Sequence, residues 1–206
     1  MRREMNAQTA NAQTTGRTQI SAMNKGKTYD MAYIGVFTVL IAICSWISIP
    51  TAIPFSLQTF AVFLAVAVLG GKRGTLAVVV YVLLGAVGVP VFAEFTGGIG
   101  IILRSTGGYI IGFIFSALIM WLMESLLGRK LWVQAVSMVL GMAACYAVGT
   151  AWFMFVYMRD TGAVGLSTVL GWCVIPFLIP DAVKIVLALT LCNTLRKPLA
   201  GIMGER

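Results

Sequence analysis

The stretch TGGYIIGFIFSALIMWLMESLL, residues 106–127, decides the fold class, because it is mostly apolar and holds one charged residue, Glu124. An α-helix needs roughly 20 mostly apolar residues to cross the hydrocarbon core of a bilayer. Within that core the backbone must satisfy its own hydrogen bonds, which a helix does and an irregular chain does not. The stretch therefore predicts a transmembrane helix.

Five further apolar runs share this character, at 31–49, 58–71, 74–90, 131–158 and 172–195. The whole chain is 59% hydrophobic and 11% charged, whereas a soluble domain carries about 25% charged residues. Run 58–71 is short for a span, and run 131–158 is long enough to tilt or to project from the bilayer. We therefore predict an all-α polytopic membrane protein with six transmembrane helices.

The basic residues predict the orientation. Apart from the basic N-terminal segment, they fall mainly in alternate gaps between the runs, at Lys72, Arg73, Arg129, Lys130, Arg196 and Lys197. Short loops rich in Lys and Arg stay on the cytoplasmic side, so both termini are expected in the cytoplasm and the chain in the cell membrane. The net charge of +8 is scattered over these boundaries without a basic patch interleaved with aromatics, so no nucleic-acid partner is expected.

The ends of the chain are predicted to be tails around one domain. Residues 1–28 are polar and lack a continuous apolar region, which indicates a disordered tail and no signal peptide. Met23 is a second candidate, beside Met1, for the start of translation. Residues 29–198 form the membrane domain, and residues 199–206 form a cytoplasmic C-terminal tail.

The residues that metal sites, disulfide frameworks and phosphate-binding loops require are missing from the sequence. The chain has no histidine, and its four cysteines, Cys44, Cys145, Cys173 and Cys192, are far apart in apolar context. They are expected to be buried thiols, with no metal site, disulfide framework or cofactor. The segment GGKRGT at 70–75 lacks the spacing of a phosphate-binding loop.

No catalytic residues are predicted, and an enzyme is not expected. A membrane-embedded enzyme that uses a serine–lysine or carboxylate mechanism stays open as the lesser alternative. A channel would need a polar stripe along several helices. The polar groups singled out below are instead expected in the outer half, with an apolar cytoplasmic half.

Two outer loops are unusual. The first, IPTAIPFSLQT at 49–59, holds two prolines that favour extended backbone, and its apolar character predicts that it folds back onto the protein. It ends in Gln58 and Thr59. The second, GVPVFAEFTGGIG at 88–100, carries Glu94 and continues to Arg104 and Tyr109. A salt bridge between Glu94 and Arg104 in a tight interhelical loop is the structural alternative to a role in binding.

The last run opens with IPDAVK at 179–184. Asp181 and Lys184 are three residues apart and share one helix face. Pro180 suits a helix start, and Asp181 suits a cap there. Ionisable residues inside an apolar run cost ~2.5–3.5 kcal/mol each near the helix centre, so they face the bundle interior or a watery cavity. A neutral pair that only holds the bundle together is the alternative. Because Gln58, Arg104, Asp181 and Lys184 come from different segments of the outer half, we predict a ligand site.

Four motifs of the sequence occur in the same order in a known family. IPFSLQT (53–59), LGAVGVPVFA (84–93), STGGYIIGF (105–113) and PDAVK (180–184) resemble the BioY family, the biotin-binding S-components of energy-coupling-factor (ECF) transporters. The resemblance covers residues 29–198. It implies a six-helix S-component that binds biotin near the outer surface through Asp181 and Lys184, with the first outer loop as part of a lid. It also implies uptake energised by a transmembrane coupling protein and ATPase subunits.

Biotin suits these residues chemically. Its ureido group would meet Asp181, Gln58 and Lys184, and its carboxylate would meet Arg104. The apolar bicycle and valeryl chain of biotin would meet Phe55, Phe92 and Tyr109. The full set of expected substrate-binding residues is Gln58, Phe55, Phe92, Glu94, Arg104, Tyr109, Asp181 and Lys184. An S-component for another water-soluble vitamin is the near alternative.

The chain departs from the family pattern in two places. S-components usually carry two alanines four residues apart on the first helix, where they contact the coupling subunit, and here Val36 follows Ala32. The expected partner contacts are Ala32, Gly35 and Val36. Arg104 and Ser105 stand before the TGGY motif where many members have Gly-Pro, which leaves the role of Arg104 open.

Overall fold

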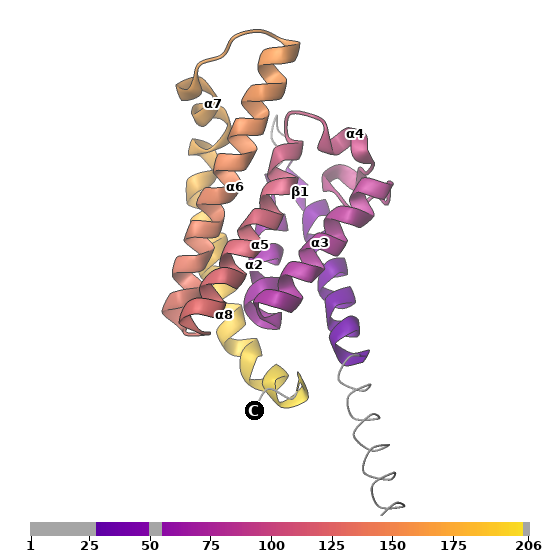
Figure 1. Ribbon diagram of the computed structural model, residues 1–206, viewed down its shortest axis with the longest axis vertical. Coiled ribbons are helices and arrows are strands. Elements are labelled where there is room, and N and C mark those ends of the chain that lie inside the picture. The colour runs from indigo at the N-terminus through magenta and orange to yellow at the C-terminus, as the bar shows by residue number, and fades with distance from the viewer. Residues whose placement is uncertain (1–27, 50–54, 204–206) are drawn as a thin grey trace, which may run out of the picture.

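The computed structural model describes residues 28–49 and 55–203, and the side chains of these residues up to 195. The described part is mainly helical, and its long helices lie roughly along one axis (Figure 1). The first of them is Thr28–Trp46. It is followed by α2 (Gln58–Leu69), α3 (Gly71–Val87), α5 (Gly107–Leu127), α6 (Leu131–Asp160) and α8 (Leu178–Met203).

Shorter elements gather at the upper end of Figure 1, the end opposite to the C-terminus. They are strands β1 (Ser48–Ile49) and β2 (Phe55–Ser56), the 3-10 turn η1 (Ala93–Phe95), helix α4 (Ile99–Ile102), helix α7 (Leu166–Cys173) and the 3-10 turn η2 (Ile175–Phe177). Strands β1 and β2 pair antiparallel, with Ser48 opposite Ser56. The first outer loop therefore begins and ends in extended backbone as predicted, although its two prolines lie outside the described residues.

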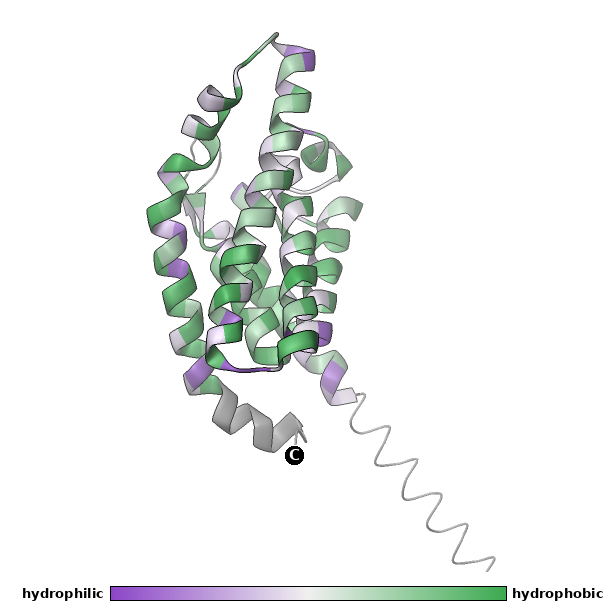
Figure 2. Cartoon of the chain, turned by 60° about the vertical axis from the view of Figure 1, so that its left-hand side comes forward, coloured by the Kyte–Doolittle hydropathy of each residue, from purple (hydrophilic) through white to green (hydrophobic). Residues whose placement is uncertain are grey.

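The helices agree with the apolar runs to within a few residues, except at the last one. Among the described residues, four segments are long and apolar enough to cross a membrane: Thr28–Trp46, Gly107–Leu127, Leu131–Asp160 and Leu166–Leu195. The last of these is interrupted, because α7 ends at Cys173 and η2, which contains Pro176, stands before α8. A proline removes a backbone donor and clashes with the preceding helical turn. The long helices are hydrophobic over most of their length (Figure 2).

Helix α2 is the centre of the bundle. It packs against α3, α5 and α8, and every residue from Ala61 to Leu69 is buried. Its sequence is apolar on all sides, which is typical of a helix surrounded by protein. With 12 residues it is only about 18 Å long at 1.5 Å per residue. Its N-terminus at Gln58 therefore ends inside the upper half of the protein, where space for a ligand remains.

The lower end of α2 is held by polar side chains. Gln134 Nε2 donates to the Ala67 carbonyl at 3.2 Å, and Arg129 donates to the carbonyls of Ala67 and Val68 at 3.3 and 3.1 Å. The last carbonyls of a helix lack partners within the helix, so these bonds satisfy them. The lower half of the bundle is therefore not apolar throughout, in contrast to the half that we expected to lack polar groups, because a helix that ends inside the bundle needs buried donors at its end.

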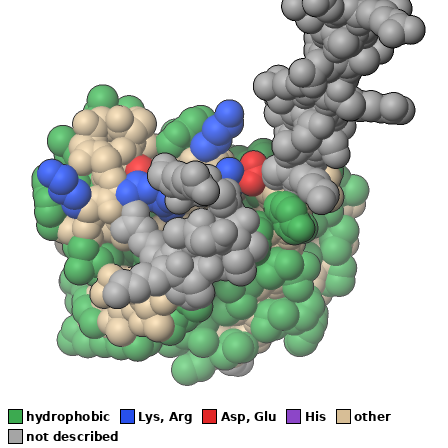
Figure 3. Space-filling view, turned by 90° about the horizontal axis from the view of Figure 1, so that it is seen from below, with side chains coloured by type: hydrophobic (Ala, Val, Ile, Leu, Met, Phe, Trp, Pro, Cys, Tyr) green, Lys and Arg blue, Asp and Glu red, His purple; other side chains and the backbone are tan. Residues whose placement is uncertain are grey.

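Charged side chains gather at the lower face (Figure 3). Arg73 pairs with Asp30 at 3.0 Å, and Arg129 pairs with Glu124 at 3.3 Å. Lys72 lies next to them. All four cysteines are buried thiols, as predicted.

Candidate functional site

A cavity of about 180 Å³ lies in the upper half of the bundle, beside the N-terminus of α2. Helices α2, α5, α6 and α8 contribute to its wall, together with the segment between α3 and α5. The lining residues are Ser56, Gln58, Thr59, Phe92, Ala93, Glu94, Thr96, Ile101, Arg104, Thr106, Tyr109, Ile110, Phe113, Met142, Cys145, Tyr146, Cys173, Phe177, Asp181 and Lys184. Seven of the eight predicted site residues are among them, and Phe55 is the exception.

Asp181 and Lys184 form an ion pair at one end of the cavity. Lys184 Nζ donates to Asp181 Oδ1 at 2.8 Å, and both side chains are almost fully buried, at 5% and 7% exposed. Tyr146 of α6 donates to the other oxygen, Oδ2, at 2.5 Å. Each carboxylate oxygen offers about two lone pairs, so Asp181 keeps acceptor capacity toward the cavity.

Asp181 does not occupy the helix cap that a helix start near Pro180 would have given it. Helix α8 begins at Leu178, two residues before Pro180, so Asp181 lies inside the first turn and not at the cap position. Its carboxylate accepts hydrogen bonds from the side chains of Tyr146 and Lys184.

Phe55 covers the charged end without lining the cavity wall. The Lys184 ammonium lies 4.2 Å from the centroid of the Phe55 ring, within the range of a cation–π contact. The same ring stacks on Phe177, with centroids 6.1 Å apart. Because Phe55 belongs to β2, these contacts fasten the end of the first outer loop over the ion pair.

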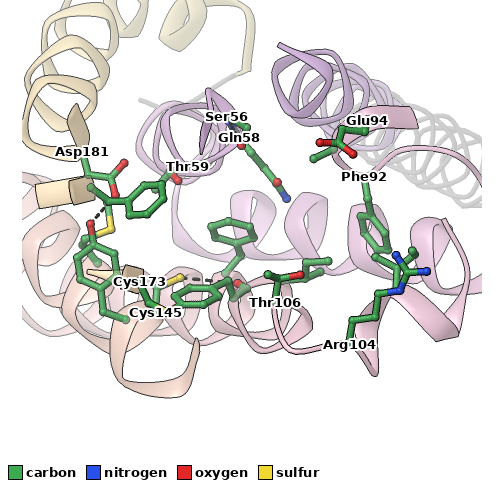
Figure 4. Close-up of a pocket in the computed structure, with 18 of the residues that line it drawn as sticks. Ser56, Gln58, Thr59, Phe92, Glu94, Arg104, Thr106, Cys145, Cys173 and Asp181 are labelled. Atoms are coloured by element: carbon green, nitrogen blue, oxygen red, sulfur yellow. Dashed lines mark hydrogen bonds between the residues drawn. The ribbon is translucent and has the colours of Figure 1, made fainter. Parts of the chain in front are cut away.

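Arg104 and Glu94 lie at the other end of the cavity. Figure 4 shows them on either side of Phe92, away from Asp181. Both are exposed, which places them at the mouth. No ion pair joins them in the part of the chain that the structure describes, so the salt-bridge alternative does not hold. Arg104 and Glu94 thus both lie at the cavity mouth without pairing with each other.

Two tryptophans hold the segment that carries these charges. Trp152 of α6 donates from Nε1 to the Arg104 carbonyl at 3.0 Å, and Trp46 of the first helix donates to the Pro90 carbonyl at 3.0 Å. Trp46 also stacks on Phe95, with centroids 4.9 Å apart. The mouth is therefore anchored to helices far away in sequence.

Gln58 and Tyr109 line the middle of the cavity. Gln58 is buried at 6% exposed and donates from Nε2 to Tyr81 Oη at 2.9 Å. The Tyr109 hydroxyl lies 3.3 Å from Thr150 Oγ1. With Phe92, Phe113 and Phe177 these residues make an apolar wall that carries a few polar atoms, which is the usual composition of a small-molecule site.

The main residue that sequence reasoning missed is Tyr146. It lies inside the long run 131–158, where nothing in the sequence indicates which face points inward. Ser56 and Thr59 also line the cavity, and both lie within two residues of Gln58 in the IPFSLQT motif. Among the described residues no group of three or more His, Cys, Asp or Glu side chains could hold a metal ion.

Known proteins show what the chain is similar to. The model of the BioY family matches residues 13–201. The chain is 43% identical to the biotin transporter BioY of Thermotoga maritima, over 79% of this chain and 93% of that protein. It is 35% identical to the probable biotin transporter BioY of Pyrococcus horikoshii, over 82% of this chain and 98% of that protein.

A solved structure agrees with these relatives. The fold is similar to the crystal structure of the S-component for biotin from an ECF-type ABC transporter, with a TM-score of 0.76. The match covers 84% of this chain and 94% of that chain at 26% sequence identity.

Proposed function

The chain belongs to the BioY family, and we infer from this premise that it captures biotin at the membrane for uptake. The observation that carries the inference is the arrangement of charges in the cavity. The buried Asp181–Lys184 pair lies at one end, Arg104 lies at the other, and aromatic side chains line the space between them. Such a cavity suits a small ligand that is polar at both ends and apolar in the middle.

Biotin has this pattern of polarity. Its ureido ring carries two N–H donors and one carbonyl acceptor. The Asp181 carboxylate at the closed end and Gln58 Oε1 in the middle of the cavity are acceptors for these N–H groups. Lys184 uses one N–H on Asp181 and has two more, which suit the ureido carbonyl. The Asp181–Lys184 pair has no net charge, so a neutral ureido group can bind beside it without creating a buried net charge.

The carboxylate of biotin then points toward the mouth. Arg104 is the cation there, and a guanidinium matches the geometry of a carboxylate. The bicyclic ring and the alkyl chain lie against Phe92 and Tyr109, with Phe55 above the charged end as part of the lid. Glu94 borders the same mouth, and we assign it to the rim of the binding site.

Energy for uphill transport comes, in this proposal, from ECF partners, a transmembrane coupling protein and ATPase subunits. Ala32, Gly35 and Val36 on the first helix are exposed. A Cβ at Gly35 would meet no described residue outside the neighbouring turns of its own helix within 4 Å. Small residues let helices approach closely, so this face suits a partner helix. Gly35→Leu should keep biotin binding and lose copurification with the coupling protein.

We place the protein in the cell membrane with six spans and both termini in the cytoplasm. The short α2 and α3 count as spans in this arrangement, because they run beside longer helices. The charged lower face, with Lys72, Arg73 and Arg129, agrees with the cytoplasmic side. The cavity then opens outward.

The test is equilibrium binding of biotin to the purified protein in detergent, without any partner. We expect saturable one-to-one binding that thiamine and riboflavin do not compete with. Absence of binding by protein that is monodisperse and unfolds cooperatively would refute the assignment of biotin. Competition by another vitamin would reassign the substrate and keep the capture role.

A further inference from the structure

Gln58 presents a polar amide to the middle of the cavity, and the direction of this amide decides what the cavity accepts. One end of the amide carries an oxygen that accepts hydrogen bonds, and the other carries a nitrogen that donates them. A ligand with N–H groups needs the oxygen. The residue that fixes the direction lies outside the cavity wall.

Tyr81 of α3 is that residue. It is fully buried, at 0% exposed, and its hydroxyl lies 3.0 Å from the Val91 carbonyl and 2.9 Å from Gln58 Nε2. A carbonyl only accepts, so the single hydroxyl proton of Tyr81 is donated to Val91. The hydroxyl must then accept from Gln58, which requires the nitrogen of the amide on the side of Tyr81.

The amide oxygen is left for the cavity. Within the described chain no donor bonds to Gln58 Oε1, although the side chain is buried. The Tyr81 ring is itself fixed, because it packs edge to face on Phe92 with centroids 5.7 Å apart. The amide therefore has little freedom to turn its nitrogen toward the ligand.

We propose that Tyr81 is a positioning residue that fixes the Gln58 amide so that the cavity presents an acceptor to N–H groups of the ligand. The inference rests on the proposed function, with the ureido N–H of biotin as the natural donor. Tyr81 touches no ligand in this proposal and acts through Gln58 alone.

A double-mutant cycle in the full-length protein tests this coupling. Tyr81→Phe removes one oxygen and keeps the ring, and we expect it to weaken biotin binding about tenfold, the effect of one hydrogen bond. Gln58→Leu should weaken binding by at least as much. In the Gln58→Leu background, Tyr81→Phe should have no further effect.

Thr75→Val is the matched control. Thr75 lies on the same helix as Tyr81, is buried, and donates from Oγ1 to the Ala117 carbonyl at 3.1 Å, away from Tyr81 and Gln58. It should bind biotin like the parent protein. Equal weakening by Thr75→Val would mean that the loss of any buried hydroxyl from α3 weakens binding, and additive losses in the cycle would mean that Tyr81 acts elsewhere than on Gln58. Either result would overturn the proposal.

Gln58→Glu gives a test that does not depend on the folding of Tyr81→Phe. A carboxyl group keeps an oxygen toward the cavity in either protonation state, so this variant should bind biotin more tightly than Gln58→Leu. Equal affinities of the two variants would overturn the proposal. Failure of the parent protein to bind biotin would instead refute the proposed function, so the two failures are distinguishable.

Discussion

The hydroxyl of Tyr146 lies 2.5 Å from Asp181 Oδ2 and joins two helices across the closed end of the cavity. With Lys184 on the other oxygen, the carboxylate is held from both sides before any ligand arrives. Bonds to a charged group are stronger than bonds between neutral groups. Asp181 is thus preorganised, and ligand binding does not have to fix the conformation of its side chain.

Asp181→Asn should weaken biotin binding by at least tenfold and leave the protein folded. An amide replaces one acceptor oxygen by a donor nitrogen and leaves Lys184 buried without its counter-ion, and hydrogen bonds to charged groups are worth about 1.5–3 kcal/mol. Titration calorimetry on the purified variant measures the change. Asp160→Asn, which breaks an exposed ion pair at the tip of α6, is the control and should bind like the parent.

Sequence reasoning identified this end of the cavity because its residues are chemically unusual. An aspartate and a lysine in an apolar helix are costly unless they are paired or solvated, and this signal is visible without coordinates. Tyr146 gives no such signal, because a tyrosine within an apolar run is equally compatible with lipid, core or ligand. Its role depends on the rotation of α6 relative to α8, which tertiary packing determines.

The same division holds for the fold. The length and hydropathy of the runs predicted the helix positions to within a few residues. They did not predict the break before α8, where η2 contains Pro176, or the backbone of the mouth, where Glu94 and Phe95 both have positive φ. These details follow from packing and hydrogen bonds between segments far apart in sequence.

Glu94→Gly should stabilise the protein. Glu94 has φ 58° and ψ 30°, the left-handed region, which costs a residue with a Cβ about 1–2 kcal/mol and costs glycine almost nothing. Because glycine gains more entropy on unfolding, we expect a net gain of about 0.5–1 kcal/mol. Thermal unfolding in detergent without biotin measures it.

Glu94→Ala is the control for that experiment, because it removes the same carboxylate and keeps the Cβ. It should unfold at or below the temperature of the parent. If alanine stabilised the protein as much as glycine, the gain would come from loss of the charge, and the backbone explanation would be wrong.

Arg129→Met should lower the free energy of unfolding by about 1–3 kcal/mol. The guanidinium donates to the carbonyls of Ala67 and Val68 and pairs with Glu124, so its loss leaves the end of α2 without these donors. Chemical or thermal unfolding measures the change. Lys130→Met removes the exposed neighbouring cation and should have little effect, and similar losses in both variants would point to net charge instead of these bonds.

Gly141→Ala should destabilise the contact between α5 and α6, and Ser116→Ala should partly restore it. A Cβ at position 141 would lie 2.6 Å from Ser116 Oγ and 3.2 Å from the Ser116 carbonyl, and overpacking of this kind costs about 1–3 kcal/mol. Ser116 Oγ is the nearest obstacle. It is buried and, within the described chain, has no hydrogen-bond partner, so Ser116→Ala alone should be neutral or slightly stabilising.

The double variant separates this contact from a general effect on the helix pair. Gly112→Ala is the matched control on the same seam, because its Cβ would meet Cys145 Sγ at 3.0 Å and not Ser116. Ser116→Ala should raise the unfolding temperature of Gly141→Ala and leave that of Gly112→Ala unchanged. Equal rescue of both variants would mean that Ser116→Ala stabilises α5 by itself, and the direct contact between positions 116 and 141 would then not be the cause.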